Sequence, residues 1–150
     1  MTARKLVIVG AGKRVVETAL PALARARGAI ELAGIFARTP REIEAAGARR
    51  SVRPLAELAP EEFAGTDLVY LAVGKANVPA ALRSLARFDL SRVDLLIETP
   101  VLLLKHYRHI SLLRRFRDVW VSEDCSELPG STPSADMWDR GRWARRARRF

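Results

Sequence analysis

Cysteine and long apolar runs are nearly absent from this 150-residue chain. Its single cysteine, Cys125, excludes an internal disulfide and favours a reducing compartment, so we expect a cytoplasmic protein. The apolar runs, such as residues 68–73, stop far short of the roughly 20 residues that a membrane-spanning helix needs. The residues before the first strand pattern leave no room for a signal-peptide core. We therefore expect no membrane as partner.

Histidine is also scarce, which limits the catalytic chemistry that can be assigned. His106 and His109 lie in a basic helical segment, where we expect solvated side chains rather than catalytic ones. Cys125 has no evident histidine partner, so we expect a small buried residue rather than a nucleophile. No group of histidine, cysteine and acidic residues has the spacing of a metal site. No catalytic residue and no metal can be assigned.

The net charge of +9 suggests a nucleic-acid partner at first sight. Residues 131–150, however, hold six arginines against two aspartates and so carry +4, which leaves +5 for the other 130 residues. The chain also lacks a recognised nucleic-acid motif and a strand surface with interleaved aromatic residues. The charge distribution therefore disfavours nucleic acid as the partner.

Strand patterns and helix patterns alternate along the first 129 residues. Strand patterns occur at residues 6–9, 30–37, 51–55, 68–73, 93–98 and 119–122. Helix patterns occur at residues 15–27, 39–46, 78–87 and 105–117. Most strand patterns are continuous apolar runs, which are typical of strands buried on both faces, and Pro21 should kink the first helix. The alternation predicts a single-domain α/β fold with a doubly wound parallel sheet.

A glycine-rich turn, Gly10-Ala11-Gly12-Lys13-Arg14-Val15, joins the first strand pattern to the first helix pattern. In a dinucleotide-binding turn, the first glycine permits the tight bend, and the second lets the backbone approach a pyrophosphate at the helix N-terminus. Val15 stands where the full fingerprint has a third glycine or alanine. The position of the turn between a buried strand and a helix predicts a dinucleotide site. Glycines that serve only the turn are the alternative.

The residues after the second strand pattern indicate which dinucleotide is preferred. An acidic residue there accepts hydrogen bonds from the adenosine ribose 2′-hydroxyl and repels a 2′-phosphate. This chain has Phe36-Ala37-Arg38-Thr39, which offers a guanidinium and a hydroxyl in place of a carboxylate. A guanidinium pairs with phosphate and stacks on adenine. The pattern favours NADP over NAD, and a solvated arginine is the alternative.

From residue 4 to about 129, the order and spacing of these motifs resemble the N-terminal Rossmann domain of the glucose–fructose oxidoreductase and inositol dehydrogenase (Gfo/Idh/MocA) family. In that family, the fourth strand ends in a small turn against the cofactor, and the next strand ends in Glu-Lys-Pro, where this chain has Glu98-Thr99-Pro100. The resemblance implies an NAD(P)-dependent oxidoreductase. It places Gly10, Gly12, Lys13 and Arg14 at the pyrophosphate, and Arg38 and Thr39 at the adenosine. It places Val73, Gly74 and Lys75 along the cofactor and Glu98 near the nicotinamide ribose.

Two departures from the family pattern lower the expected activity. Thr99 replaces the lysine beside nicotinamide and substrate, and threonine has no ammonium to polarise a substrate hydroxyl or shuttle its proton. We expect no counterpart of the family's second α/β domain, which supplies most substrate contacts and usually mediates oligomerisation. We expect weak or absent turnover on an unidentified substrate, and homo-oligomerisation stays open. The alternative is a non-catalytic nucleotide-binding, regulatory or partner-binding protein.

Residues 130–150 differ in character from the rest, being rich in arginine and tryptophan without helical or strand periodicity. Such a composition is what a G+C-rich gene yields when it is read out of frame. One choice of codons for this segment, shifted by one base, encodes a stretch that resembles natural protein. We therefore assign residues 1–129 to the Rossmann domain and expect 130–150 to be a disordered basic tail. Our hypothesis is that the tail is an out-of-frame remnant of a lost second domain.

Overall fold

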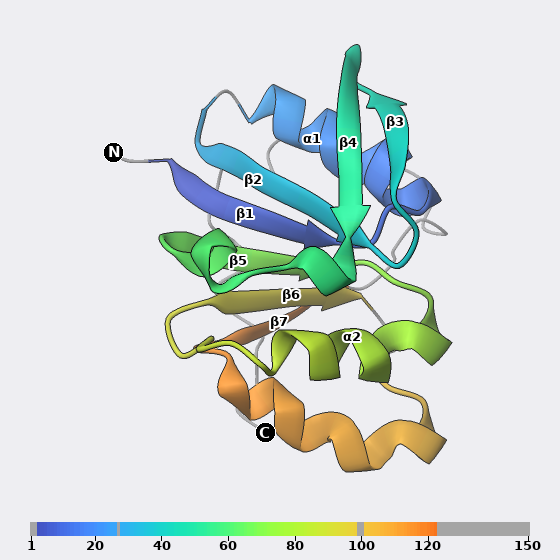
Figure 1. The fold of residues 1–150 in the computed structure, drawn as a ribbon, viewed down its shortest axis with the longest axis vertical. Helices are drawn as coiled ribbons and strands as arrows, with labels where there is room; N and C mark the ends of the chain where they lie inside the picture. The colour runs from blue at the N-terminus through green and yellow to red at the C-terminus, as the bar shows by residue number, and fades with distance from the viewer. Residues whose placement is uncertain (1–2, 27, 99–100, 123–150) are drawn as a thin grey trace, which may run out of the picture.

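A computed structural model describes residues 3–26, 28–98 and 101–122, which form a seven-stranded sheet with helices on both faces (Figure 1). The strands are β1 (Arg4–Val9), β2 (Ile30–Ala37), β3 (Arg41–Ala45), β4 (Ala48–Pro54), β5 (Thr66–Leu71), β6 (Asp94–Glu98) and β7 (Val119–Ser122). Their order in the sheet is β3-β4-β2-β1-β5-β6-β7, and every neighbouring pair is parallel except β3 and β4. The expected α/β fold with a doubly wound parallel sheet is confirmed, and the antiparallel β3–β4 pair is the one departure among the described strands.

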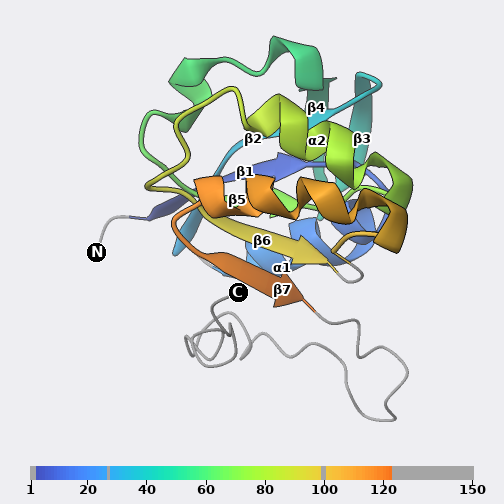
Figure 2. The ribbon, with the colours of Figure 1, turned by 90° about the horizontal axis from the view of Figure 1, so that it is seen from below.

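The apolar runs form strands because the sheet has a hydrophobic core on each face. In β1, Val7 and Val9 belong to the core under α2 (Val78–Leu85), whereas Leu6 and Ile8 belong to the core under α1 (Leu20–Arg25). Figure 2 shows α1 on one side of the sheet and α2 on the other. A strand buried on both faces needs apolar side chains at every position, which explains the continuous runs.

The helix after β1 is irregular in the turn before its proline, where the sequence predicts a kink. It begins with a π-helical segment, η1 (Val15–Ala19), and continues as α1, whose second residue is Pro21. Proline lacks a backbone N–H, and its ring clashes with the carbonyl one turn earlier, so the hydrogen-bond pattern loosens in that turn. Short 3₁₀ turns lie elsewhere in the described chain: η2 (Leu55–Glu57), η3 (Pro60–Phe63) and η4 (Lys75–Asn77).

The basic helix expected at residues 105–117 is a 3₁₀ helix, η5 (Leu104–Arg115). Every third residue of a 3₁₀ helix lies on the same face. Accordingly, Lys105, Arg108 and Arg114 are all exposed along one side, whereas Leu112 packs against the core under α2. The predicted position and amphipathic character hold, but the helix is wound more tightly than an α-helix.

The helix expected at residues 39–46 is wrong, because this segment belongs to the β3–β4 hairpin. Ala45 pairs with Ala48, and the two residues between them have φ of 54° (Ala46) and 74° (Gly47), as in a type I′ turn. Ile43 and Ala45 alternate with exposed glutamates and pack into the core under α1. Burial with a period of two residues outweighs the helix propensity of glutamate and alanine. The strand expected at 51–55 lies mostly within β4.

Several sequence-based expectations concern residues outside the described ranges. These are the Thr99-Pro100 pair, the buried Cys125 and the disordered tail at 130–150. Within the described ranges, no helix has the length and apolar character needed to cross a membrane.

Candidate dinucleotide-binding site

The bend after β1 can be made only by glycine at position 10. Gly10 has φ of +123°, and a Cβ there would lie 2.1 Å from the carbonyl oxygen of Ala72. The Gly10 N–H donates to the Phe36 carbonyl at 2.7 Å, and the Ala72 N–H donates to the Val9 carbonyl at 2.8 Å. The bend is therefore enclosed between the ends of β2 and β5, so Gly10 is required by the fold itself.

Gly12 stands in a different environment. A Cβ at Gly12 would have no neighbouring atom within 4 Å, and its φ lies outside the region that favours glycine. Its carbonyl accepts hydrogen bonds from the N–H groups of Val15 at 3.0 Å and Val16 at 3.2 Å, so the helix starts here. The described residues give no packing reason for glycine at this position. Open space above a backbone at a helix start is what a bound pyrophosphate requires.

Three polar side chains meet beside this turn, at the edge where the strands end. Glu98, the last residue of β6, pairs with Arg14, with 3.0 Å between Oε1 and the arginine Nε. The buried Tyr70 of β5 donates its hydroxyl to the same Oε1 at 2.5 Å. The structure thus brings Arg14 and Glu98 together, and the arginine neutralises a protein carboxylate. Sequence reasoning missed Tyr70, although it is the one hydroxyl in the otherwise aliphatic run at residues 68–73.

The loop after β5 lies against the glycine turn. A methyl carbon of Val73 would be 3.4 Å from a Cβ on Gly10, and the Gly74 carbonyl accepts a hydrogen bond from the Asn77 N–H at 2.7 Å to start η4. Lys75 is exposed beyond it. Lys13, on the other side of the turn, is also exposed and stands 3.7 Å from Glu17. These residues, predicted to line the cofactor, therefore share one edge of the sheet.

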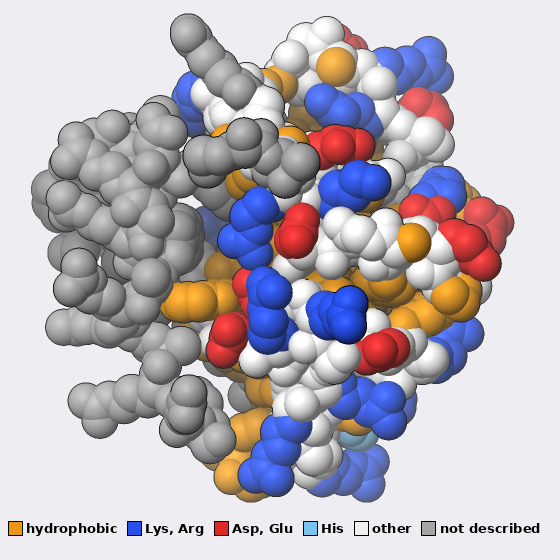
Figure 3. All heavy atoms as spheres, turned by 90° about the vertical axis from the view of Figure 1, so that its left-hand side faces the viewer, with side chains coloured by type: hydrophobic (Ala, Val, Ile, Leu, Met, Phe, Trp, Pro, Cys, Tyr) orange, Lys and Arg blue, Asp and Glu red, His pale blue; other side chains and the backbone are white. Residues whose placement is uncertain are grey.

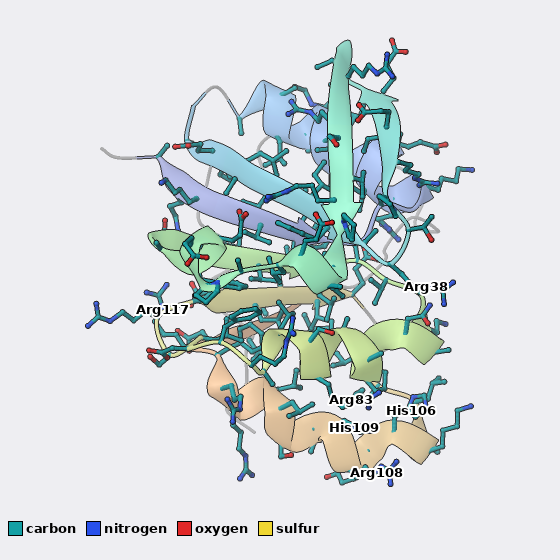
Figure 4. The ribbon with its side chains drawn as sticks, viewed as in Figure 1. Arg38, Arg83, His106, Arg108, His109 and Arg117 are labelled. Carbon is teal, nitrogen blue, oxygen red and sulfur yellow. The ribbon has the colours of Figure 1, made fainter. Side chains whose placement is uncertain are left out.

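The connection from β2 to β3 carries the residues predicted to read the adenosine. Arg38 and Thr39 are exposed, and among the described residues Arg38 makes no hydrogen bond or ion pair. Figure 4 shows Arg38 at the edge where the strands end, with Arg117 at the opposite edge. Sequence reasoning missed Arg41, which donates from Nη2 to the Ala11 carbonyl of the glycine turn. The wrong helix assignment hid this contact, since it placed Arg41 in a helix rather than at the start of a strand.

A carboxylate held by two arginines, Asp94, lies at the opposite edge and serves the fold. Asp94 accepts hydrogen bonds from Nε and Nη2 of Arg117 at 2.7 and 2.8 Å, and from Arg4 at 2.9 Å. Burial by itself would raise the pKa of Asp94, but the hydrogen bonds from Arg117 and Arg4 outweigh it and lower that pKa. Figure 3 views this edge and shows basic and acidic side chains intermingled.

The two histidines lie on η5, away from the glycine turn (Figure 4). Desolvation lowers the pKa of His109, and so do the positive charges of Arg83 and Arg108, whose nitrogens lie 3.5 and 3.4 Å from its Nε2. The described residues contain no group of three or more histidine, cysteine or acidic side chains that could hold a metal ion.

Comparison with known proteins supports the fold. No family model and no curated protein sequence matches the chain, so membership of the Gfo/Idh/MocA family is not confirmed. Among solved structures, it is similar to an oxidoreductase from Bacillus cereus, with 17% identity over 81% of this chain and 34% of that one, and a TM-score of 0.52. The fold is Rossmann-like.

Two further neighbours were solved with a dinucleotide bound. The Rex-family repressor RSP in complex with beta-NADH has 17% identity over 81% of this chain and 53% of that one, with a TM-score of 0.53. The WlbA dehydrogenase from Bordetella pertussis, in complex with NADH and UDP-GlcNAcA, has 17% identity over 80% of this chain and 37% of that one, with a TM-score of 0.50. This chain therefore spans between a third and about half the length of these neighbours.

Proposed function

We propose that this chain binds a nicotinamide dinucleotide at the edge where β1, β5 and β6 end, as the cofactor half of a Gfo/Idh/MocA-like oxidoreductase. The observation that carries the proposal is the contrast within the glycine turn: Gly10 is required by packing, whereas Gly12 faces open space at the start of a helix. A ligand accounts for a glycine that packing does not. The NADH complexes of two neighbours in fold support this assignment.

Within this proposal, each predicted residue has a role that follows from its position. Lys13, with the backbone at Gly10 and Gly12, would hold the pyrophosphate, and Val73, Gly74 and Lys75 would line the cofactor. Glu98 would accept a hydrogen bond from the nicotinamide ribose. Because Arg14 is paired with Glu98 at 3.0 Å, we revise its role from a pyrophosphate ligand to a positioning residue for that carboxylate. Tyr70 acts in the same way.

The cofactor that we propose is NADP rather than NAD. The second strand is followed by Arg38 and Thr39 and by no carboxylate, and the guanidinium of Arg38 is exposed. A guanidinium attracts a 2′-phosphate, whereas a carboxylate would repel it. The bound cofactor would supply the hydride-transfer chemistry, but Thr99 supplies no ammonium for the accompanying proton. We therefore propose weak or absent turnover for the chain alone.

Titration calorimetry with NADPH and NADH tests this function. We expect stoichiometric binding of both, with NADPH tighter, and Arg38→Ala should remove much of that preference. Equal affinity or a preference for NADH would refute the NADP assignment, and binding of neither would refute the function. Arg25→Ala is a suitable control, because Arg25 lies in the last turn of α1, outside the residues of the proposed site.

A second function is favoured by one comparison. Because one neighbour is a Rex-family repressor solved with beta-NADH, a non-catalytic role as a nucleotide-responsive regulator or partner-binding protein also fits this fold. Both functions predict stoichiometric cofactor binding without turnover. A protein that co-purifies with the chain and dissociates when NADPH is added would favour the regulatory role.

A further inference from the structure

The β3–β4 hairpin brings an arginine to the glycine turn from outside the turn. Arg41 is the first residue of β3, and its Nη2 donates to the carbonyl of Ala11, between Gly10 and Gly12. Had residues 39–46 formed a helix, as the sequence predicts, Arg41 would lie in the first helical turn. The hairpin instead starts at Arg41, directly after the short connection from β2.

The position of this contact determines which part of a dinucleotide would meet Arg41. The ends of β1 and β2 are adjacent, since Val9 pairs with Phe36 and the Gly10 N–H bonds to the Phe36 carbonyl. In dinucleotide-binding domains, the adenosine ribose lies between the end of the second strand and the turn, and the pyrophosphate lies over the helix start. Arg41 reaches Ala11 from the β2 side, so its guanidinium borders the ribose position.

The guanidinium of Arg41 also has N–H donors that no described residue uses and that a ligand could accept. An arginine side chain has five N–H donors, and the Ala11 carbonyl is the only partner it has among the described residues. The adjacent acid, Glu42, is engaged elsewhere, with its carboxylate 3.4 Å from Nε of Arg49. Arg38, three residues before Arg41, is exposed and makes no hydrogen bond or ion pair within the described chain. The connection after β2 and the first residue of β3 thus supply two guanidinium groups, those of Arg38 and Arg41.

We propose that Arg41 and Arg38 form a subsite for a phosphomonoester on the adenosine ribose, with Arg41 held in place by its bond to Ala11. The ligand group is the 2′-phosphate of NADP. This inference rests on the proposed dinucleotide function and adds to it a specificity-determining residue on the hairpin. Two other roles for Arg41 make different predictions: contact with the pyrophosphate would affect every dinucleotide equally, and ordering of the turn would depend on the hydrogen bond rather than on the charge.

Calorimetry on the full chain with NADPH, NADH, adenosine 2′,5′-bisphosphate and 5′-AMP distinguishes these roles. Arg41→Ala should weaken NADPH and the bisphosphate by about 10-fold to 100-fold, the range expected for a charge-assisted hydrogen bond. NADH and 5′-AMP should change by less than about 2-fold, since neither has the 2′-phosphate. Arg41→Gln should behave as Arg41→Ala does, because glutamine is polar but lacks the positive charge that a phosphate requires. Arg49→Ala on the same hairpin, which removes a cation already paired with Glu42, should leave all four affinities unchanged.

Each other outcome overturns the subsite. Equal losses for all four ligands would assign Arg41 to the pyrophosphate, and a loss in Arg41→Ala that Arg41→Gln restores would assign it to the turn. If the unchanged chain binds NADH and NADPH equally, the subsite fails while dinucleotide binding stands. If it binds neither, both proposals fail. Thermal unfolding of each variant shows whether the fold is retained, and Arg41→Gln serves if Arg41→Ala is unstable.

Discussion

At the scale of single residues, the two glycines of the turn have different reasons to be glycine. Gly10 combines a positive φ with a carbonyl 2.1 Å from where its Cβ would lie, whereas Gly12 has neither constraint. A sequence motif presents them as equivalent. Only the surrounding strands separate a glycine that the fold needs from one that, under the proposed function, a ligand needs.

Substitutions at these two positions should therefore have different effects. Gly10→Ala should lower the free energy of unfolding by more than about 2 kcal/mol, since a strained φ and an overpacked contact each cost about 1–3 kcal/mol. Gly12→Val should leave the Tm nearly unchanged yet abolish binding of NADPH and NADH, because its side chain would fill the space of the pyrophosphate. Urea denaturation and calorimetry measure the two effects. Dinucleotide binding that survives Gly12→Val would contradict the proposed site.

Asp94 provides a pH-dependent prediction. Its pKa is lowered in the folded chain, so its contribution to stability is complete above the ordinary aspartate pKa of about 3.9 and is lost as the pH falls through the folded-state pKa. Asp94→Asn should lower the free energy of unfolding by about 2 kcal/mol at pH 7, the size expected for hydrogen bonds to a charged group. The difference between the two proteins should shrink below about pH 4. A difference that stays constant from pH 7 to pH 3 would show that the charge of Asp94 is not responsible.

At the scale of elements, the β3–β4 hairpin is the clearest departure from the sequence-based expectation. The segment Glu42–Ala46 is rich in helix formers, yet Ile43 and Ala45 alternate with exposed residues and face the core. Two signals in the sequence could have identified the hairpin, namely this alternation and Gly47. This difference affects the candidate site, because the hairpin, unlike a helix, lets the Arg41 side chain donate a hydrogen bond to the Ala11 carbonyl in the glycine turn.

A stabilising substitution in the turn of this hairpin tests the backbone conformation of the turn. Ala46 has φ of 54°, a left-handed conformation that is unfavourable for alanine by roughly 1–2 kcal/mol and that asparagine tolerates better. Ala46→Asn creates the Asn-Gly pair that type I′ turns prefer and should raise the free energy of unfolding by about 0.5–1 kcal/mol. Gly47→Ala should lower it, since the φ of Gly47 is 74°. If Ala46→Asn destabilises the chain in urea denaturation, the turn has a different geometry.

At the scale of the whole molecule, the described chain has a Rossmann-like fold and spans only part of the length of each structural neighbour. Its coverage is 34% of the Bacillus cereus oxidoreductase and 37% of the WlbA dehydrogenase.

We expect the isolated chain to bind its cofactor without oxidising sugars or polyols at a useful rate. By the family resemblance, Thr99 stands where a lysine would handle the substrate proton. The measurement is NADPH formation, followed by absorbance, with a panel of polyols and with Thr99→Lys as the comparison. Turnover by the unchanged chain would show that Thr99 does not limit the chemistry.

The sequence by itself determined the class of fold and the place of the glycine turn. The central residues of β1, β5 and β6 are mostly apolar and buried, and burial on both faces of a parallel sheet requires that composition whatever the details of packing. The turn is local as well, since its two glycines are adjacent to the strand and helix that they join.

Only the tertiary structure decided how the side chains around the turn are used. Arg14 is engaged by Glu98, 84 positions away in the chain, and Arg41 reaches Ala11 from a strand that local propensity would have made a helix. Such pairings depend on which strand ends lie side by side, so no periodicity in the sequence reports them. The backbone preferences of a segment are local, whereas the partners of its charged side chains are set by the packing of the whole sheet.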